Sequence, residues 1–157
     1  MSKKKSKSFI GIDVSKQELE VAAHESDFKF RCANKISCFG QLIAELIVLR
    51  PALIVLEATG GLEIPVVNAL HAVGLPVVVV NPRQVRDFAK ALGQLAKTDR
   101  LDARVLAHFA AAIKPPLRPI KAKDEQELDA LMGRRGQLVE MLTDEPSRRL
   151  TLARPLI

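Results

Sequence analysis

Between residues 9 and 34, apolar and polar positions alternate in three short runs. The runs cover residues 9–15, 19–25 and 28–34, and short polar segments separate them. A period of two residues places every second side chain on one face of a strand, and such short links favour antiparallel neighbours. The pattern therefore predicts a three-stranded antiparallel meander at the start of the domain.

Beyond residue 34 the period lengthens, and helical spacing alternates with short, wholly apolar runs. Apolar runs of this kind are typical of buried parallel strands. The elements predicted in chain order are helix 39–50, strand 52–58, helix 62–74, strand 76–81, helix 82–92 and helix 98–113. Three strands followed by alternating helices and strands indicate an α/β fold with antiparallel and parallel parts.

The helix predicted at residues 98–113 begins with two acidic residues on or near its apolar side. One face is expected to carry Leu101, Val105, Leu106, Phe109, Ala112 and Ile113. The opposite face is expected to carry Arg100, Ala103, Arg104 and Lys114. Asp102 falls within the apolar sector, and Asp99 lies one turn away at its edge. Two explanations stay open: helix capping, with Asp99 as N-cap and Asp102 at the third position, or binding of a divalent cation.

The last part of the chain differs from the rest in composition. A basic tail is expected at residues 1–8, a compact domain at 9–114, a Pro-rich linker at 115–123 and a coiled-coil-like helical segment at 124–157. Within that segment Leu128, Leu131, Leu138 and Leu142 recur at heptad-like spacing. Because an isolated helix of this length is marginal in water, it is expected to pack on a second copy of the chain or on its own domain.

Composition narrows the class of protein. The chain has 157 residues, of which 48% are hydrophobic, and a formal net charge of +6. The apolar runs are too short to cross a bilayer, and the lysine-rich start lacks a signal-peptide pattern, so a cytoplasmic protein is expected. Cys32 and Cys38 are expected to be reduced packing residues, and the three scattered histidines are assigned no chemistry. The positive charge permits an anionic partner without identifying one.

Acidic residues interrupt two strands that otherwise suit a core. Asp13 falls within the apolar run at residues 9–15, and Glu57 closes the run at 52–58. Taken singly, each is explained by a turn or an ion pair. Together with Asp99 and Asp102 they form a set of carboxylates expected at one sheet edge. Such hard oxygen ligands select Mg²⁺ or Mn²⁺, which suits phosphodiester chemistry.

Basic residues on the last two predicted helices are candidates for contacts with a nucleic-acid backbone. These candidates are Arg83, Arg86, Lys90, Lys97, Arg100 and Arg104. Lysine and arginine neutralise phosphates without reading sequence. An ordinary solvated basic face is the alternative explanation.

Three motifs carry a resemblance to a known family. "GIDVSK" at 11–16, "LEATGG" at 56–61 and the segment 80–110 with its "KTDRLDA" block resemble the N-terminal DEDD domain of bacterial insertion-sequence transposases related to Piv DNA invertases. The resemblance implies a ribonuclease H-like (RuvC-like) mixed sheet flanked by helices, followed by a helical stalk. It implies that Asp13, Glu57, Asp99 and Asp102 are the catalytic, metal-binding carboxylates.

The same resemblance implies an activity and partners. These are Mg²⁺-dependent (or Mn²⁺-dependent) DNA strand exchange in the bacterial cytoplasm at the nucleoid, a guide RNA, and a homo-oligomer formed through the helical stalk. Similar proteins continue into a second domain that supplies a nucleophilic serine, and the chain is therefore expected to be a fragment or a truncated copy. The motif of that nucleophile is matched by none of Ser15, Ser26, Ser37 and Ser147.

Two other functions remain alternatives. The "GIDVSK" segment also resembles the first phosphate loop of actin-like and sugar-kinase ATPases, although the chain lacks their second Asp-Gly loop. A non-catalytic nucleic-acid-binding or assembly module, with the acids as caps and ion pairs, is the other alternative. Dependence on ATP would indicate the first, and binding without any metal dependence the second.

Overall fold

In a computed structural model the described residues are 8–93 and 102–117, together with 125, 128, 131–136, 138–139 and 141–142. The chain forms two units, Met1–Pro119 and Ile120–Ile157. The described residues of the second unit are helical. Within the described residues, no helix combines the length and the apolar character that crossing a membrane requires.

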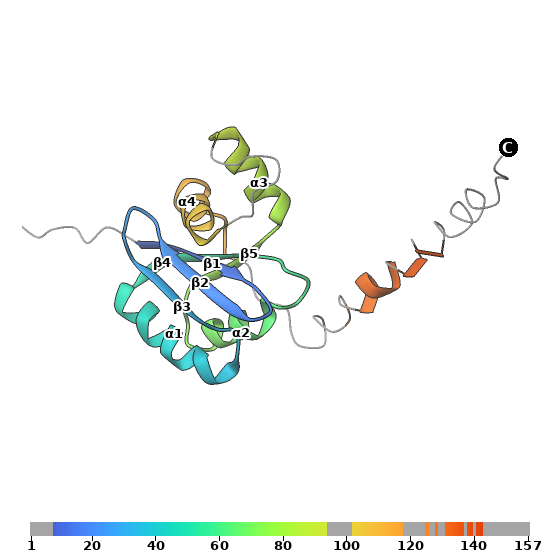
Figure 1. The fold of residues 1–157 in the computed structure, drawn as a ribbon, viewed down its shortest axis with the longest axis horizontal. Helices are drawn as coiled ribbons and strands as arrows, with labels where there is room; N and C mark the ends of the chain where they lie inside the picture. Colours follow the sequence, from blue (N-terminus) through green and yellow to red (C-terminus); the bar gives the residue numbers. More distant parts are fainter. Residues whose placement is uncertain are drawn as a thin grey trace, which may run out of the picture. The chain divides into compact units, whose positions relative to one another are not determined.

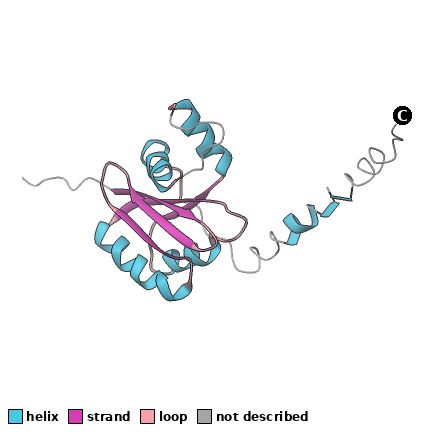
Figure 2. Ribbon diagram, in the orientation of Figure 1, coloured by secondary structure: helices cyan, strands magenta, loops and turns pink. Residues whose placement is uncertain are grey.

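A five-stranded mixed sheet forms the centre of the first unit (Figures 1 and 2). Its strands are β1 (Ser8–Val14), β2 (Glu18–Ala23), β3 (Lys29–Ala33), β4 (Pro51–Glu57) and β5 (Val77–Val80). Their order in the sheet is β3-β2-β1-β4-β5. β2 runs antiparallel to β1 and β3, while β4 runs parallel to β1 and to β5. The predicted meander and the two predicted parallel strands are thus confirmed.

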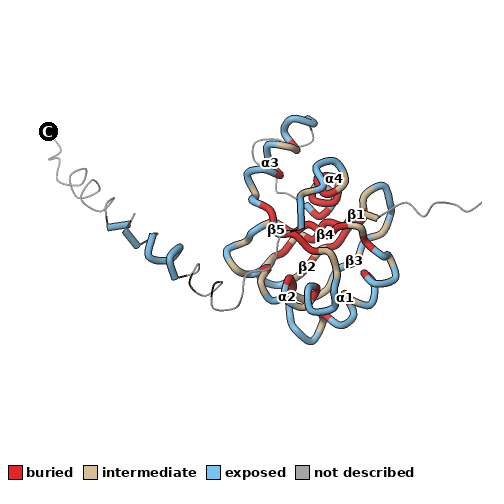
Figure 3. Tube along the Cα trace, turned by 180° about the vertical axis from the view of Figure 1, so that it is seen from behind, coloured by how far each residue is buried: buried red, intermediate tan, exposed pale blue. Residues whose placement is uncertain are grey.

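Helices cover both faces of this sheet (Figure 1). The helices are α1 (Ile36–Leu49), α2 (Ile64–Ala72), α3 (Pro82–Ala91) and α4 (Ala103–Ile113). α1 and α2 lie together on one face, and α3 and α4 lie together on the other. Side chains alternate along each strand, so β1 and β4 contribute buried residues to both layers, as the red segments in Figure 3 show. The predicted fold class, a mixed sheet flanked by helices, is confirmed.

The start and the buried face of α4 differ from the prediction. The helix begins at Ala103 rather than at residue 98, because Asp102 has an extended backbone and caps it. Its buried residues are Ala103, Leu106, Ala107, Phe109 and Ala110. Ala112 and Ile113 are exposed, so the predicted apolar face was wrong at that end. The true face is rotated toward the alanines, which are small enough to let the helix approach the sheet closely.

Gly11 on β1 is the point of closest approach between the sheet and α4. A Cβ atom at this position would lie 2.7 Å from Leu106 Cβ, and closer still to the carbonyl oxygen of Ala103 and the amide nitrogen of Ala107. Backbone atoms of a packed helix cannot move aside without shifting the whole element. The absence of a side chain at residue 11 therefore sets the distance between β1 and the first turn of α4.

Replacing Gly11 with alanine tests this close packing. Gly11→Ala should lower the free energy of unfolding by about 1–3 kcal/mol or more, since overpacking forces α4 off the sheet. Urea denaturation monitored by circular dichroism measures the change. Gly40→Ala is the matched control, because a Cβ at this exposed α1 position meets nothing within 4 Å. The control should be neutral or more stable by about 0.5–1 kcal/mol. Equal effects of the two substitutions would contradict the account.

Candidate active site

Asp13 and Glu57 lie side by side at the carboxyl ends of two parallel strands. Ile12 of β1 pairs with Leu56 of β4, so the next residues along the strands are these two acids. Paired residues of neighbouring strands share a face, and the alternation places both acids on the face of Gly11, which α4 covers. Both residues are part-buried, and the Oε2 atom of Glu57 is buried. Open α/β sheets bind ligands at this edge.

Asp102 reaches the same edge from the start of α4. Its Oδ1 atom accepts a hydrogen bond of 2.9 Å from the Val105 amide, which makes it the N-cap. The capping alternative that placed Asp99 at the N-cap and Asp102 at the third position is thus wrong. An aspartate is among the best N-caps, since its carboxylate satisfies an amide that the first helical turn leaves without a partner. Capping occupies one of the two carboxylate oxygens.

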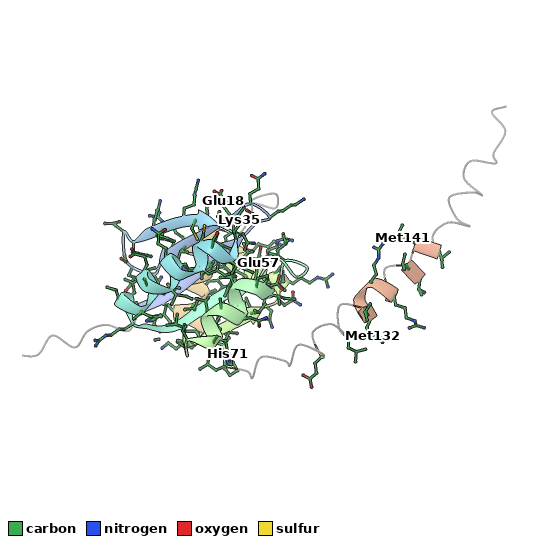
Figure 4. The ribbon with its side chains drawn as sticks, turned by 90° about the horizontal axis from the view of Figure 1, so that it is seen from below. Glu18, Lys35, Glu57, His71, Met132 and Met141 are labelled. Carbon is green, nitrogen blue, oxygen red and sulfur yellow. The ribbon has the colours of Figure 1, made fainter. Side chains whose placement is uncertain are left out.

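A hollow of about 530 Å³ brings two of the predicted carboxylates together. Its lining residues are Asp13, Ser15, Lys16, Gln17, Glu18, Glu20 and Asp102. Glu57 lies next to Asp13 in the sheet but does not line this hollow. Figure 4 labels Glu18 and Glu57, which stand at the ends of β2 and β4 near this edge. Asp99 lies outside the described residues.

The donor chemistry of this edge suits a hard cation. Carboxylate oxygens are the ligands that Mg²⁺ and Mn²⁺ prefer. In the part of the chain that the structure describes, no group of three or more acidic, histidine or cysteine side chains is arranged to hold a metal ion. Asp13 and Asp102 line the same hollow and have the oxygen donors that such an ion prefers. Two carboxylates alone do not make a full set of ligands for it.

The loop after β4 is held by a buried acid that the sequence analysis missed. The Glu63 side chain is only 7% exposed. Its Oε2 atom accepts hydrogen bonds from the Thr59 amide at 3.1 Å, the Thr59 hydroxyl at 2.8 Å and the Gly61 amide at 3.0 Å. Gly60 and Gly61 have positive φ values of 72° and 104°, which explains the glycine pair of the "LEATGG" motif. This network fixes the backbone that immediately follows Glu57.

A second turn at the same edge is fixed through Ser15. Its hydroxyl donates to the Glu18 carbonyl and accepts from the Glu18 amide, which shapes the link between β1 and β2. The Asn34 side-chain amide then donates to the carbonyls of Ser15 and Leu62. Asn34 therefore ties the turn after Asp13 to the loop after Glu57.

Four of the six predicted nucleic-acid contacts fall on two helices. Arg83, Arg86 and Lys90 are exposed on α3, and Arg104 is exposed in the first turn of α4. Lys97 and Arg100 lie outside the described residues. α3 and α4 pack against each other on the face of the sheet that carries Asp13.

Two of the histidines make ring contacts, and both cysteines are free. The rings of His24 and His108 stack with centroids 5.0 Å apart, and Phe88 meets His108 edge-on. Cys32 and Cys38 are free thiols. Burial, and to a lesser extent the neighbouring Cys38, raises the pKa of the Cys32 thiol above its ordinary value. The unreactive, protonated form is therefore favoured near neutral pH.

A model of a transposase family, the DEDD transposases of the IS110 type, matches residues 10–152. The pilin gene-inverting protein of Moraxella bovis is 30% identical over 154 residues, which cover 94% of this chain and 48% of that protein. The transposase for insertion sequence element IS1111A of Coxiella burnetii is 24% identical over 134 residues, covering 85% of this chain and 35% of that protein. The chain thus spans half or less of the length of these curated relatives.

A solved structure of RuvC from Thermus thermophilus covers 73% of this chain and 83% of its own, with 17% identity and a TM-score of 0.42.

Removing the Glu63 carboxylate tests its role in the loop. Glu63→Ala should lower the free energy of unfolding by about 1–3 kcal/mol, because three donors lose a buried acceptor. Glu63→Gln keeps one acceptor oxygen and should lose less. Denaturant titration measures both, with Glu45→Ala on the exposed side of α1 as control. A Glu63→Ala variant as stable as this control would contradict the assignment.

Proposed function

Because the chain belongs to the DEDD transposase family of the IS110 type, we propose that it is the metal-binding catalytic domain of a DNA transposase or recombinase. Its substrate would be a phosphodiester bond of DNA, and its cofactor Mg²⁺ or Mn²⁺. The observation that carries the proposal is that Asp13 of β1 and Asp102 of α4 line one hollow, next to Glu57 of β4.

Two structural constraints act on these three carboxylates. Asp13 and Glu57 are held by the register of two central strands, whose axes lie about 4.8 Å apart. Asp102 is oriented by the hydrogen bond from the Val105 amide. We propose Asp99 as the fourth carboxylate, supplied by the segment just before α4. Like charges this close repel one another, so the set is stabilised by a cation.

A divalent ion bound there would polarise a phosphoryl oxygen and generate hydroxide from water near neutral pH. The contribution of the protein is to hold carboxylate oxygens at a rigid edge and to keep the substrate strand beside them. Exposed Arg83, Arg86, Lys90 and Arg104, with Lys97 and Arg100, would bind the strand through its phosphates. Binding of this kind is independent of sequence, so target choice requires another component. We propose a guide RNA for that role.

The second unit would serve assembly. Several of its described side chains are apolar and exposed, including Leu128, Leu131, Met132, Leu138 and Leu142, and Figure 4 labels Met132 and Met141. Exposed apolar side chains at heptad-like spacing favour association, and we propose homo-oligomerisation through this segment in the bacterial cytoplasm at the nucleoid. We propose that catalysis also uses a serine nucleophile, which the family resemblance implies is supplied by a second domain.

One observation favours a second candidate, a non-catalytic nucleic-acid-binding or assembly module. Asp102 already has a structural role as the N-cap of α4, and a capping role needs no metal. The two candidates differ in what a divalent cation does to the protein. The family assignment leaves no support for the ATP-binding alternative.

Thermal unfolding with and without divalent cations separates the two candidates. Mg²⁺ or Mn²⁺ should raise Tm, since an ion at a hundred times its Kd stabilises the native state by about 2.7 kcal/mol. Asp13→Asn and Asp102→Asn should abolish the rise. Asparagine is as good an N-cap as aspartate, so Asp102→Asn removes the charge while keeping the helix cap.

The same variants carry their own control for misfolding. In metal-free buffer both should be as stable as the parent or more so, because each removes one of several like charges. Glu45→Gln, an exposed change on α1, should leave the metal-induced rise intact. The absence of a metal-induced rise in the parent chain, or a rise that persists in Asp13→Asn and Asp102→Asn, would favour the non-catalytic module.

A further inference from the structure

Strand β3 presents two cations to the face of the sheet that carries Asp13. Asp13 pairs with Glu20 across β1 and β2, and Glu20 pairs with Arg31 across β2 and β3. Ala22 pairs with Lys29 two residues away. Because paired residues point to the same face, Lys29 and Arg31 lie on the α4 side of the sheet. Both are exposed, since α4 packs on β1, β2 and β4.

These cations border a hollow that adjoins the acidic one. The hollow has a volume of about 230 Å³, and Lys29, Arg31 and Arg104 contribute its basic side chains. Glu20 and Asp102 line it too, and both also line the hollow at Asp13. The two hollows therefore share a wall formed by these two acids, and the basic side chains lie on the side of it away from Asp13. We name Lys29, Arg31 and Arg104 the cationic shelf.

The charges of the shelf have few internal partners. Arg31 forms ion pairs with Glu18 and Glu20, which hold its guanidinium above β2. In the described part of the chain, Lys29 and Arg104 take part in no ion pair. Arg104 also lies in the first turn of α4, where the helix dipole disfavours a positive charge. A positive charge at this position lowers the stability of the helix, and binding of an anion would explain why an arginine is found there.

We propose that the cationic shelf binds phosphates of a DNA strand next to the phosphodiester that lies at Asp13 and Asp102. This inference rests on the proposed function and adds a path for the strand. Two strand spacings separate Asp13 from Arg31, about 10 Å, which is the axial rise of about three nucleotides. The carboxylates repel a polyanion, so cations this near offset the repulsion and set the direction in which the strand crosses the sheet. The shelf differs from the basic face of α3, to which Arg83, Arg86 and Lys90 belong.

The test is DNA binding by the full chain in Mg²⁺ buffer, measured over a series of salt concentrations. The probe is a short, fluorescein-labelled single strand of DNA of mixed sequence, followed by fluorescence anisotropy. Lys29→Gln and Arg104→Gln should each weaken binding several-fold. Each should also reduce the slope of log affinity against log salt by about 0.7, the value for one lost contact with a single strand. Lys29→Arg should restore the slope.

The matched control is Arg50→Gln, at the opposite end of the sheet. Arg50 is exposed and follows α1 just before β4 begins, so its loss should leave the slope unchanged. Lys29→Gln and Arg50→Gln should unfold at the Tm of the parent chain. Arg104→Gln should unfold at that Tm or slightly above it, because it removes a positive charge from the first turn of α4. An RNA strand of the same sequence serves as a second probe. Variants that weaken RNA binding alone would overturn the assignment to DNA.

Two failures are distinguishable. If the parent chain binds DNA with a salt-dependent affinity, and Lys29→Gln and Arg104→Gln bind as Arg50→Gln does, the shelf is wrong. The proposed function then stands without Arg104 as a DNA contact. If the parent chain binds no DNA at low salt in the presence of Mg²⁺, both are overturned.

Discussion

The contact between Gly11 and the first turns of α4 determines the geometry of the whole site. With no side chain at residue 11, the backbone of α4 rests directly on β1, and its small buried residues Ala103 and Ala107 maintain the approach. Asp13 follows two residues later on the same face of β1. The residue that caps α4, Asp102, is thereby brought to the hollow that Asp13 lines. A larger residue at position 11 would separate the two carboxylates as well as the two elements.

Around this contact, the loops at the carboxyl edge are fixed by hydrogen bonds rather than by apolar packing. Glu63 accepts three hydrogen bonds from the loop after β4, and Asn34 connects that loop to the turn after β1. The apolar core thus ends at the carboxyl ends of β1 and β4, where these hydrogen-bonded loops begin. Such an arrangement suits a site whose charged groups must keep their positions when a cation and a polyanion arrive.

The strands were predictable from sequence, and Asp13 and Glu57 could be singled out as candidates, because each leaves a local signal. A charged residue in an apolar strand, as at Asp13, is unusual whatever the fold, and alternation marks a strand without knowledge of its neighbours. The start of α4 was not predictable, because Asp99 and Asp102 are both candidates for the N-cap and the sequence does not show which of them has the extended backbone of a capping residue. Its buried face was misplaced because hydrophobicity ranks Ile113 above Ala103, whereas close packing on Gly11 requires the smaller side chain. Glu63 was not predicted because its hydrogen bonds depend on the conformation of the loop after β4. Lys29 was not predicted because its position near the site depends on the pairing of β3 with β2.

The central claim is that Asp13 and Asp102 jointly bind one divalent cation at the end of β1. A crystal of the chain grown with Mn²⁺ tests it most directly, because anomalous scattering locates manganese without reference to the protein atoms. The account predicts a peak within coordination distance, about 2.0–2.3 Å, of carboxylate oxygens from both aspartates. Manganese bound elsewhere, or an Asp102 carboxylate that only caps α4 in saturating Mn²⁺, would contradict it.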